Sequence, residues 1–247
     1  MTTLYPWQLT WRDEVTSTMD EIKPLLGAPG FIALSAGLQT QGRGRRGHEW
    51  TSHKGNVFLS CAMPLDLPLV RLSEWAFGAG VALARTCRLY VKETACTLKW
   101  PNDLLIEDKK VAGLLIEAYT NPLTSNLWVI LGVGVNLTHS PNLNERKTIA
   151  LSHVTNALPT KQIFVDTFLK QLSHLWDLWH TQGFEAIRLA WLDLAHPIGT
   201  PLCVNKNTGT LYGTFLDLDP RGRLLLEMKD GERVFITAAD VFIGEQK

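Results

Sequence analysis

The strand-like segments in the first part of the chain do not alternate regularly with helical ones, and this order limits the fold more than any other feature. Apolar runs typical of short buried strands lie at 31–36 and 57–62, before a helical stretch at 69–89. Four more strand-like runs then follow without a helix between them, at 97–100, 103–106, 111–118 and 127–135. Parallel neighbours need long crossover connections, so the pattern predicts an α+β domain around an antiparallel or mixed sheet.

Helical signals lie on both sides of these strands. Thr18 and Glu21 have the spacing of a capping box, which predicts a helix that begins after Thr18 and ends near Gly27. Pro24 makes that helix short or distorted. Apolar residues recur at helical spacing across 161–180, and a further helix is predicted over 184–194.

The chain changes character after the dipeptide His196-Pro197. From residue 200 onward only short strand-like runs remain, joined by turn sequences such as Asp230-Gly231. A run of five short strands over about 45 residues predicts a small barrel. We therefore expect two domains, one over residues 1–198 and the other over residues 199–247.

Charge and cysteine content exclude several classes of protein. The chain of 247 residues carries 24 Lys+Arg and 24 Asp+Glu, which argues against a protein that binds nucleic acid through bulk charge. The four cysteines are far apart and form no CxxC pair, so we expect reduced thiols rather than a zinc site or a disulfide framework. Without a signal-like N-terminus or an apolar run long enough to span a bilayer, the sequence predicts a cytoplasmic protein with no membrane contact.

The most informative segment is the polar stretch 39–47, in which three arginines are interspersed with three glycines. Glycines let a backbone approach a ligand closely, and arginines pair with phosphate or carboxylate oxygens. The stretch lacks both the Gly-Lys-Ser/Thr of a P-loop and the GxGxxG spacing of dinucleotide sites. It predicts anion binding, with a solvated basic loop or an RNA-binding arginine–glycine tract as alternatives.

A second segment places an acid and a lysine on one expected hairpin. The pentapeptide Lys-Trp-Pro-Asn-Asp at 99–103 precedes Lys110, with a turn expected over 107–110. Because the two strands of a short hairpin pair directly, Asp103 and Lys110 are predicted to lie close together. An ordinary surface salt bridge is the alternative.

Two further segments are ambiguous when they are taken singly. Glycines alternate along the strand at 131–136, which leaves one face bare for a flat ligand or for another close-packed backbone. The hydroxyl residues Thr16, Ser17 and Thr18 stand at a helix entrance, where most such side chains are only caps. Neither segment predicts a site without the others.

In their order and spacing, however, these segments closely resemble the biotin–protein ligases. The resemblance rests on Ser17-Thr18, the hexapeptide 42–47 followed by Trp50, the pentapeptide 99–103, Lys-Lys-Val-Ala-Gly at 109–113 and Gly-Val-Gly-Val-Asn at 132–136. It is dense over about residues 14–137 and weaker beyond. It implies a catalytic domain related to class II aminoacyl-tRNA synthetases and lipoate ligases, followed by an SH3-like barrel.

The resemblance also implies a reaction and its participants. Such enzymes use ATP with Mg²⁺ to convert biotin to biotinyl-5′-AMP, and transfer the biotinyl group to a lysine of a biotin carboxyl carrier protein, a subunit of acetyl-CoA carboxylase. Larger relatives carry an N-terminal DNA-binding domain that represses transcription. Since the first family motif begins by residue 17, we expect a ligase that does not bind DNA, either a monomer or a homodimer, with no metal site of its own.

Carried over residue by residue, the family motifs imply three sets of site residues. The expected catalytic residues are Lys110, Arg43 and Asp103. The expected biotin-binding residues are Ser17, Thr18, Gln39, Gly42, Arg43, Gly44, Arg45, Lys110, Gly113 and Gly132. The expected ATP or adenylate contacts are Arg43, Arg45, Trp50, Asn102, Lys110 and Asn136.

The sequence departs from the family pattern at a few positions and leaves rival functions open. Met19 stands where the family has asparagine, His53 stands where proline is usual, and the stretch 52–56 is one residue shorter than in many relatives. No aromatic residue near 147–151 offers the adenine stacking found in some relatives. The alternatives are a lipoate or octanoate ligase or transferase of the same superfamily, and an RNA-binding module that uses the arginines of 43–46.

Overall fold

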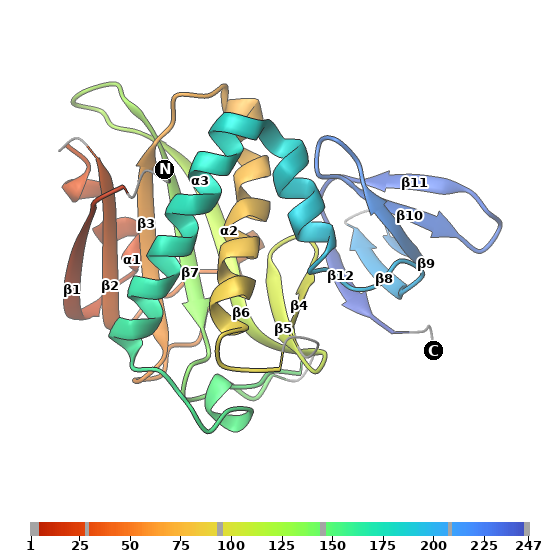
Figure 1. The fold of residues 1–247 in the computed structure, drawn as a ribbon, viewed down its shortest axis with the longest axis horizontal. Helices are drawn as coiled ribbons and strands as arrows, with labels where there is room; N and C mark the ends of the chain where they lie inside the picture. The colour runs from red at the N-terminus through yellow and green to blue at the C-terminus, as the bar shows by residue number, and fades with distance from the viewer. Residues whose placement is uncertain (1–4, 28–29, 93–95, 144–146, 207–208, 245–247) are drawn as a thin grey trace.

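The computed structural model describes residues 5–27, 30–92, 96–143, 147–206 and 209–244, which form two sheets and their covering helices (Figure 1). The larger sheet has the strand order β1-β2-β3-β7-β6-β5-β4. Its strands are β1 (Trp7–Val15), β2 (Phe31–Gln39), β3 (Val57–Pro64), β4 (Cys96–Lys99), β5 (Asp103–Ile106), β6 (Lys109–Thr120) and β7 (Leu127–Val135). The α+β class predicted from the sequence is confirmed.

The larger sheet is mixed, because β1 runs parallel to β2 while the other neighbours are antiparallel. The strand β1 is not predicted from the sequence. This strand lies at the edge of the sheet, and Arg12, Asp13 and Glu14 in its second half are exposed. An edge strand with charged residues lacks the apolar run by which the other strands were recognised.

Two long helices cover one face of this sheet, α2 (Leu72–Cys87) and α3 (Lys161–Leu192) (Figure 1). Trp75 of α2 packs edge-on against Trp176 and stacks on Trp179, both from α3, so aromatic rings fill the space between the helices. Within α3, Gly183 has φ 75° and breaks the helical geometry. The two helices predicted over 161–180 and 184–194 correspond to the two helical segments of α3 on either side of Gly183.

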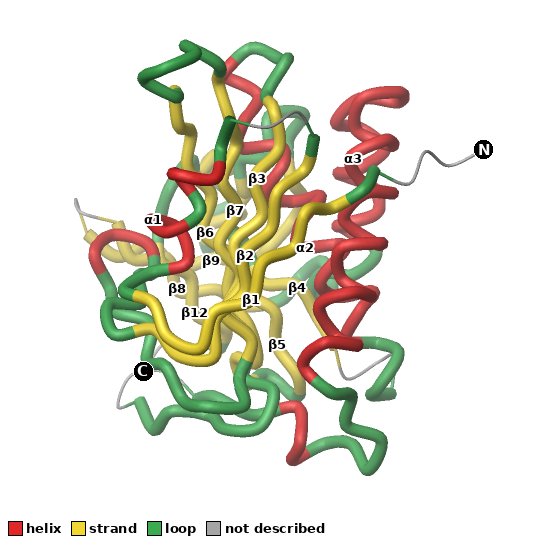
Figure 2. The backbone as a smooth tube through the Cα atoms, turned by 90° about the vertical axis from the view of Figure 1, so that its left-hand side faces the viewer, coloured by secondary structure: helices red, strands yellow, loops and turns green. Residues whose placement is uncertain are grey.

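The opposite face of the sheet carries only a short covering. Helix α1 (Thr18–Glu21) passes into a 3₁₀ turn, Lys23–Leu25, as expected for a helix distorted by Pro24. Ile22 and Leu26 belong to a small core cluster with apolar side chains of β2, β3 and β7. Figure 2 shows α1 on one side of the sheet and α2 and α3 on the other. Beside α1, this face is approached by the loop that joins β2 to β3 rather than by a long helix.

The smaller sheet contains the last five strands, in the order β11-β10-β9-β8-β12, all antiparallel. They are β8 (Pro201–Lys206), β9 (Gly209–Leu218), β10 (Leu224–Met228), β11 (Arg233–Ile236) and β12 (Asp240–Ile243). The turn after β9 is stabilised by Asp219, whose Oδ1 accepts the N–H groups of Arg221 and Arg223. The five predicted strands are confirmed, while closure into an SH3-like barrel and the boundary at 198/199 stay predictions.

The smaller sheet is joined to the larger part of the protein by specific polar contacts. The indole Nε1 of Trp100 donates to the carbonyl oxygen of Gly222 at 3.0 Å, and Nη1 of Arg188, on α3, pairs with Asp217 Oδ1 at 2.9 Å. Lys99, the last residue of β4, also donates from its Nζ to Val241 O of β12 at 2.8 Å, so the start of β12 lies next to the β4–β5 hairpin. Among the described helices, none is both long and apolar enough to cross a membrane.

Candidate active site

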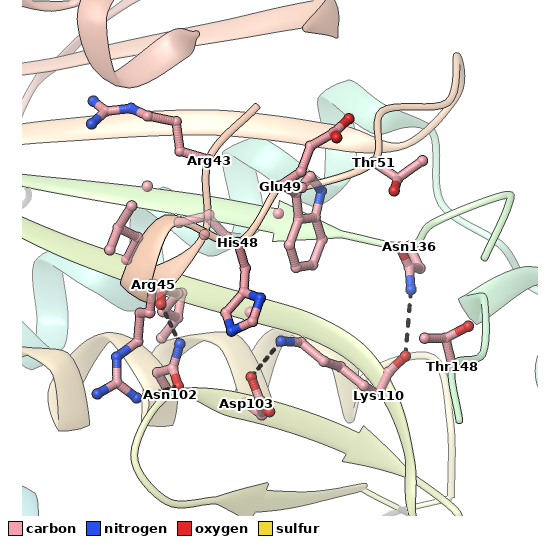
Figure 3. Close-up of a pocket in the computed structure, with 18 of the residues that line it drawn as sticks. Arg43, Arg45, His48, Glu49, Thr51, Asn102, Asp103, Lys110, Asn136 and Thr148 are labelled. Atoms are coloured by element: carbon pink, nitrogen blue, oxygen red, sulfur yellow. Dashed lines mark hydrogen bonds and ion pairs between the residues drawn. The ribbon is translucent and has the colours of Figure 1, made fainter. Parts of the chain in front are cut away.

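A pocket of about 420 Å³ lies on the face of the larger sheet that carries α1. Its wall is formed by the entrance of α1, the end of β2, the loop of residues 40–52 between β2 and β3, residues 99–103, the strands β6 and β7 with the segment after β7, and the start of β12. We call residues 40–52 the Arg/Gly loop. Figure 3 shows side chains from the loop and from the strands converging on the same space.

The Arg/Gly loop folds back on itself above the sheet. Its two limbs are joined by hydrogen bonds from Trp50 N to Gly42 O at 2.9 Å and from Gly44 N to His48 O at 2.7 Å. A β-carbon on Gly42 would lie only 2.6 Å from Trp50 O, so this close approach requires glycine. Gly42 is not among the residues that line the pocket, and its contact with biotin stays a prediction.

The Arg43 side chain leads away from the centre of the pocket. Its Nη2 lies 2.9 Å from Asp20 Oδ1 and its Nη1 lies 3.2 Å from Glu117 Oε1. In Figure 3 its guanidinium points away from Lys110. Arg43 and Asp20 are both substantially exposed, so the pair is weakly held and its partners can exchange at little energetic cost.

The other two arginines of the loop reach across to different parts of the protein. Arg45 Nη1 donates to Asn102 Oδ1 at 3.2 Å, and Arg46 Nη1 pairs with Asp240 Oδ2 at 3.1 Å. Together with Arg43, all three arginines have polar partners within the protein. This arrangement disfavours the solvated basic loop and the RNA-binding tract, both of which need the arginines directed at solvent.

The β5–β6 hairpin brings together the acid and the lysine that the sequence singled out. Glu107 and Asp108, with φ 50° and 58°, form a two-residue turn of the kind that suits the twist of antiparallel strands. Lys110 Nζ lies 2.6 Å from Asp103 Oδ1, and Lys99 Nζ lies 2.9 Å from Asp103 Oδ2. The predicted proximity is confirmed, and a second lysine shares the same carboxylate.

Asp103 is a buried carboxylate between two cations. Burial raises the pKa of Asp103, but the charges and hydrogen bonds of Lys110 and Lys99 outweigh burial and hold this pKa well below its usual value. The side chain of Asp103 is 5% exposed, against 16% for Lys110. Asp103 is thus ionised at any physiological pH and is a poor proton acceptor, while Lys110 stays accessible from the pocket.

Glycines of β6 and β7 make room for the indole of Trp50. A β-carbon on Gly134 would lie 2.3 Å from Trp50 Cε2, and one on Gly113 would lie 3.0 Å from Trp50 Cζ3. Lys110 Nζ stands 5.4 Å from the centre of the same ring. The bare strand face predicted from the alternating glycines is confirmed, and an aromatic side chain of the loop lies on it.

Hydroxyl and amide groups line the end of the pocket next to α1. Gln39 Oε1 accepts hydrogen bonds from Thr18 N at 2.9 Å and from Thr18 Oγ1 at 3.0 Å, and Ser60 Oγ donates to Thr18 Oγ1 at 2.9 Å. These bonds orient the Gln39 amide so that its N–H groups remain as donors. Ser17 stands at the N-cap of α1 but makes no side-chain cap bond, so capping does not explain its hydroxyl.

Asn136 and Met19 are two further buried residues of the pocket wall, the first polar and the second apolar. Asn136 Nδ2 donates to Lys110 O at 3.4 Å, and its buried Oδ1 has no hydrogen-bond donor among the described residues. The Met19 sulfur covers Gly132, lying 2.7 Å from the position of a β-carbon on that glycine. Met19 therefore contributes an apolar, flexible surface at the position where the family pattern has an amide.

The pocket contains most of the residues predicted from the sequence. Those that line it are Ser17, Thr18, Gln39, Arg43, Gly44, Arg45, Trp50, Asn102, Asp103, Lys110, Gly113, Gly132 and Asn136. The sequence analysis did not assign His48, Lys99, Gly134 or Asp240, which also line it. Lys99 and Gly134 stand inside motifs that were recognised, whereas nothing near Asp240 in the sequence indicated a site.

Substitution of Gly134 should disturb the site more than substitution of Gly132. In Gly134→Ala the new methyl group meets the rigid indole of Trp50, whereas in Gly132→Ala it meets the flexible end of Met19. Overpacking against a rigid neighbour is expected to lower the free energy of unfolding by about 1–3 kcal/mol. Urea denaturation of both variants measures the difference, and equal losses would contradict the placement of Trp50.

Comparison of the sequence with protein families gives two matches. The profile of the Biotin/lipoate A/B protein ligase family matches residues 30–136, and that of the Biotin protein ligase C terminal domain matches residues 202–244. The Bifunctional ligase/repressor BirA of Bacillus subtilis is 33% identical, over 96% of this chain and 74% of that protein. The Biotin--[acetyl-CoA-carboxylase] ligase of Paracoccus denitrificans is 31% identical, over 93% of this chain and 97% of that protein.

Solved structures share the fold. The biotin protein ligase of Aquifex aeolicus, in complex with biotin and ATP, superposes with a TM-score of 0.79 at 22% identity, over 96% of this chain and 99% of that one. The biotin protein ligase of Leishmania major, in complex with biotinyl-5-AMP, superposes with a TM-score of 0.66 at 22% identity, over 93% and 98% of the two chains.

Proposed function

Because the chain belongs to the biotin protein ligases of the biotin/lipoate A/B protein ligase family, we propose that it joins biotin to a carrier protein at the expense of ATP. In the first step the biotin carboxylate attacks the α-phosphorus of ATP, which forms biotinyl-5′-AMP and releases pyrophosphate. In the second step a carrier lysine takes the biotinyl group and AMP leaves. The observation that carries the proposal is the Lys110–Asp103 pair at 2.6 Å in the wall of the pocket.

The first step requires cations, because it brings a carboxylate against a phosphate. Lys110 stands between the Trp50 ring and Asp103, where its ammonium can contact the biotin carboxylate and the α-phosphate oxygens together. Arg45 supplies a second charge from the loop. Arg43 joins them when it exchanges its exposed carboxylate partners, Asp20 and Glu117, for phosphate oxygens.

Biotin lies at the end of the pocket next to α1. There the amide N–H groups of Gln39 and the hydroxyls of Ser17 and Thr18 offer a few placed hydrogen bonds to the polar ureido ring. Gly113 and Gly132 leave room for the rings, and the Met19 side chain supplies an apolar contact. Gly42 and Gly44 shape the loop backbone that covers the ligand.

The nucleotide lies toward the Trp50 side of the pocket. Asn136 provides an amide group there, and its buried Oδ1 is without a donor among the described residues, as expected for an atom that a ligand satisfies. Asn102 lies on the other side of Asp103 (Figure 3), where it accepts from Arg45 and donates to Leu114 O; in this proposal it contacts the adenylate together with Arg45. Mg²⁺ enters with ATP as part of the substrate. Its ligands in this proposal are chiefly phosphate oxygens and water, as is usual for Mg²⁺ that accompanies a nucleotide.

The second step places a carrier lysine beside Asp103. When Lys110 turns to the phosphate, one oxygen of the Asp103 carboxylate is released and can accept the incoming ammonium. The amine then loses a proton to solvent, its nitrogen attacks the acyl carbon, and the bond from that carbon to the phosphate oxygen breaks. Since Asp103 is a weak base, its role is to hold the amine rather than to deprotonate it.

A biotin carboxyl carrier protein is the proposed acceptor, in line with the activity in the name of the Paracoccus denitrificans relative. We also propose that the protein works in a cytoplasm. The four cysteines are free thiols, and Cys61, Cys87 and Cys96 are buried in the core, which suits a reducing compartment.

The choice of carboxylic acid substrate tests this function directly. The purified protein is incubated with ATP, Mg²⁺ and an apo carrier domain, with biotin, lipoate or octanoate as the acid. We expect ATP-dependent labelling of a single carrier lysine by biotin, and none by the other two acids. Labelling by lipoate or octanoate alone would overturn biotin as the substrate and assign the pocket to the rival ligase.

A further inference from the structure

The tip of the Arg/Gly loop is tied to the C-terminal sheet at the mouth of the pocket. Arg46 Nη1 lies 3.1 Å from Asp240 Oδ2, across 194 residues of sequence. Asp240 is the first residue of β12, where it pairs with Asn205 of β8, and it lines the same pocket as the loop. Arg46 therefore contacts a residue that is held in a sheet by strand pairing, rather than a residue of another loop.

The loop tip bends sharply at Arg46, the residue that makes this contact. Arg46 has φ 54° and ψ 30°, a left-handed conformation that residues other than glycine rarely adopt. In that conformation its side chain leaves the tip toward β12, whereas Arg45 turns toward Asn102. Two consecutive arginines therefore hold the two sides of the pocket mouth.

The start of β12 also contacts the residues below the loop. Lys99 Nζ donates to Val241 O at 2.8 Å and pairs with Asp103 at 2.9 Å. Asp240 and Val241, adjacent in β12, therefore reach the loop tip and the Lys99–Asp103 pair respectively. The start of β12 therefore contacts both the Arg/Gly loop, which covers the pocket, and the Lys99–Asp103 pair, where the carrier lysine would arrive.

We propose that the Arg46–Asp240 ion pair is a latch that holds the Arg/Gly loop closed over biotinyl-5′-AMP, so that the C-terminal sheet controls how long the intermediate is retained. This role rests on the proposed function and extends it to a residue of the C-terminal sheet. Asp240 is a positioning residue, because it acts through Arg46. The side chains of Arg46 and Asp240 are 32% and 25% exposed, so the latch can open in water without unfolding either sheet.

The latch predicts faster loss of the intermediate when the ion pair is removed. In Asp240→Asn the loop should open more often, and we expect biotinyl-5′-AMP to dissociate about fivefold faster, the scale of a partly exposed ion pair. Lysines of a protein that is not a carrier, added to the same reaction, should become labelled in proportion to this dissociation rate. Arg46→Gln should have the same effect, and the double variant should be no faster than either single one.

The matched control is the Arg188–Asp217 pair, which also joins the larger part of the protein to the C-terminal sheet, at 2.9 Å, but does not touch the loop. Asp217→Asn should release biotinyl-5′-AMP at the parent rate. The double variant Arg46→Asp with Asp240→Arg rebuilds the ion pair with the charges exchanged and should restore slow release. If the single variants acted by disturbing the packing of the sheet, this exchange would not restore it. Release is followed with radiolabelled biotinyl-5′-AMP during a chase with the unlabelled compound.

The outcomes separate the latch from the function on which it rests. Parent-like release from both single variants, or equally fast release from Asp217→Asn, would overturn the latch alone. Additive effects of Arg46→Gln and Asp240→Asn would also overturn it, because the residues would then act separately. A parent protein that neither forms nor retains biotinyl-5′-AMP would overturn the proposed function and the latch with it.

Discussion

Lys110→Ala is expected to lower biotin-dependent release of pyrophosphate by about 10²–10³-fold, the range seen when one charge-stabilising donor is removed from a catalytic site. The protein should remain folded, because the buried Asp103 carboxylate keeps Lys99 as its partner at 2.9 Å. Pyrophosphate release in single turnovers measures the loss, and circular dichroism checks the fold.

Lys109→Ala provides the matched control for this variant. Lys109 is the neighbouring residue on β6, and its exposed side chain lies 3.9 Å from Glu107 and outside the lining of the pocket. Its removal should leave pyrophosphate release at the parent level. If Lys110→Ala formed biotinyl-5′-AMP as fast as Lys109→Ala did, the assignment of Lys110 to the first step would be wrong.

Asp103→Asn is expected to act mainly on the second step. The variant keeps an acceptor oxygen but loses the charge that holds the incoming ammonium, so transfer from preformed biotinyl-5′-AMP to the carrier should fall by about 100-fold. Rapid-quench measurement of carrier labelling isolates this step. Asp108→Asn, in the exposed turn of the same hairpin, is the control and should transfer at the parent rate.

The loss of stability expected in Asp103→Asn depends on pH in a defined direction. Loss of the Asp103 charge leaves Lys99 and Lys110 facing each other, and we expect the free energy of unfolding to fall by about 3 kcal/mol at neutral pH. Because the pKa of Asp103 is lowered in the folded state, its contribution is complete above the unfolded pKa of about 3.9. It is lost only as the pH falls further, toward the folded pKa.

Urea denaturation of the parent and of Asp103→Asn at several pH values tests the direction of this pH dependence. The difference in unfolding free energy between the parent and Asp103→Asn should be constant from about pH 5 to pH 8 and should shrink below about pH 4. A difference that changed between pH 5 and pH 8 would show that the Asp103 carboxylate titrates there. Asp103 would then be basic enough to deprotonate the carrier lysine, contrary to the role proposed here.

The parts of the site that the sequence predicted correctly are those formed by local chain geometry. Asp103 and Lys110 lie on strands joined by a two-residue turn; Lys110 pairs with Leu105, so its long side chain reaches Asp103 two residues further along the same face. The bare face around Gly132 and Gly134 follows in the same way from the alternation of side chains along a strand. Neither inference depends on knowing what packs against the strand.

The features that the sequence did not predict depend on contacts between distant segments. The approach of Asp240 to Arg46 requires the packing of the C-terminal sheet, and no local pattern specifies it. The pairing of Arg43 with Asp20 and Glu117 likewise joins three separate elements. A glycine–arginine sequence predicts that anions are bound, but it does not predict which carboxylates the arginines contact beforehand.

The decisive measurement is a crystal structure of the protein with biotinyl-5′-AMP. We expect the oxygens joining the acyl and phosphoryl groups to lie within hydrogen-bond distance of Lys110 Nζ, beneath the Arg/Gly loop, with Asp103 next to the acyl carbon. An intermediate whose acyl–phosphate linkage lay away from the Lys110–Asp103 pair would contradict the claim that this pocket both forms and delivers it.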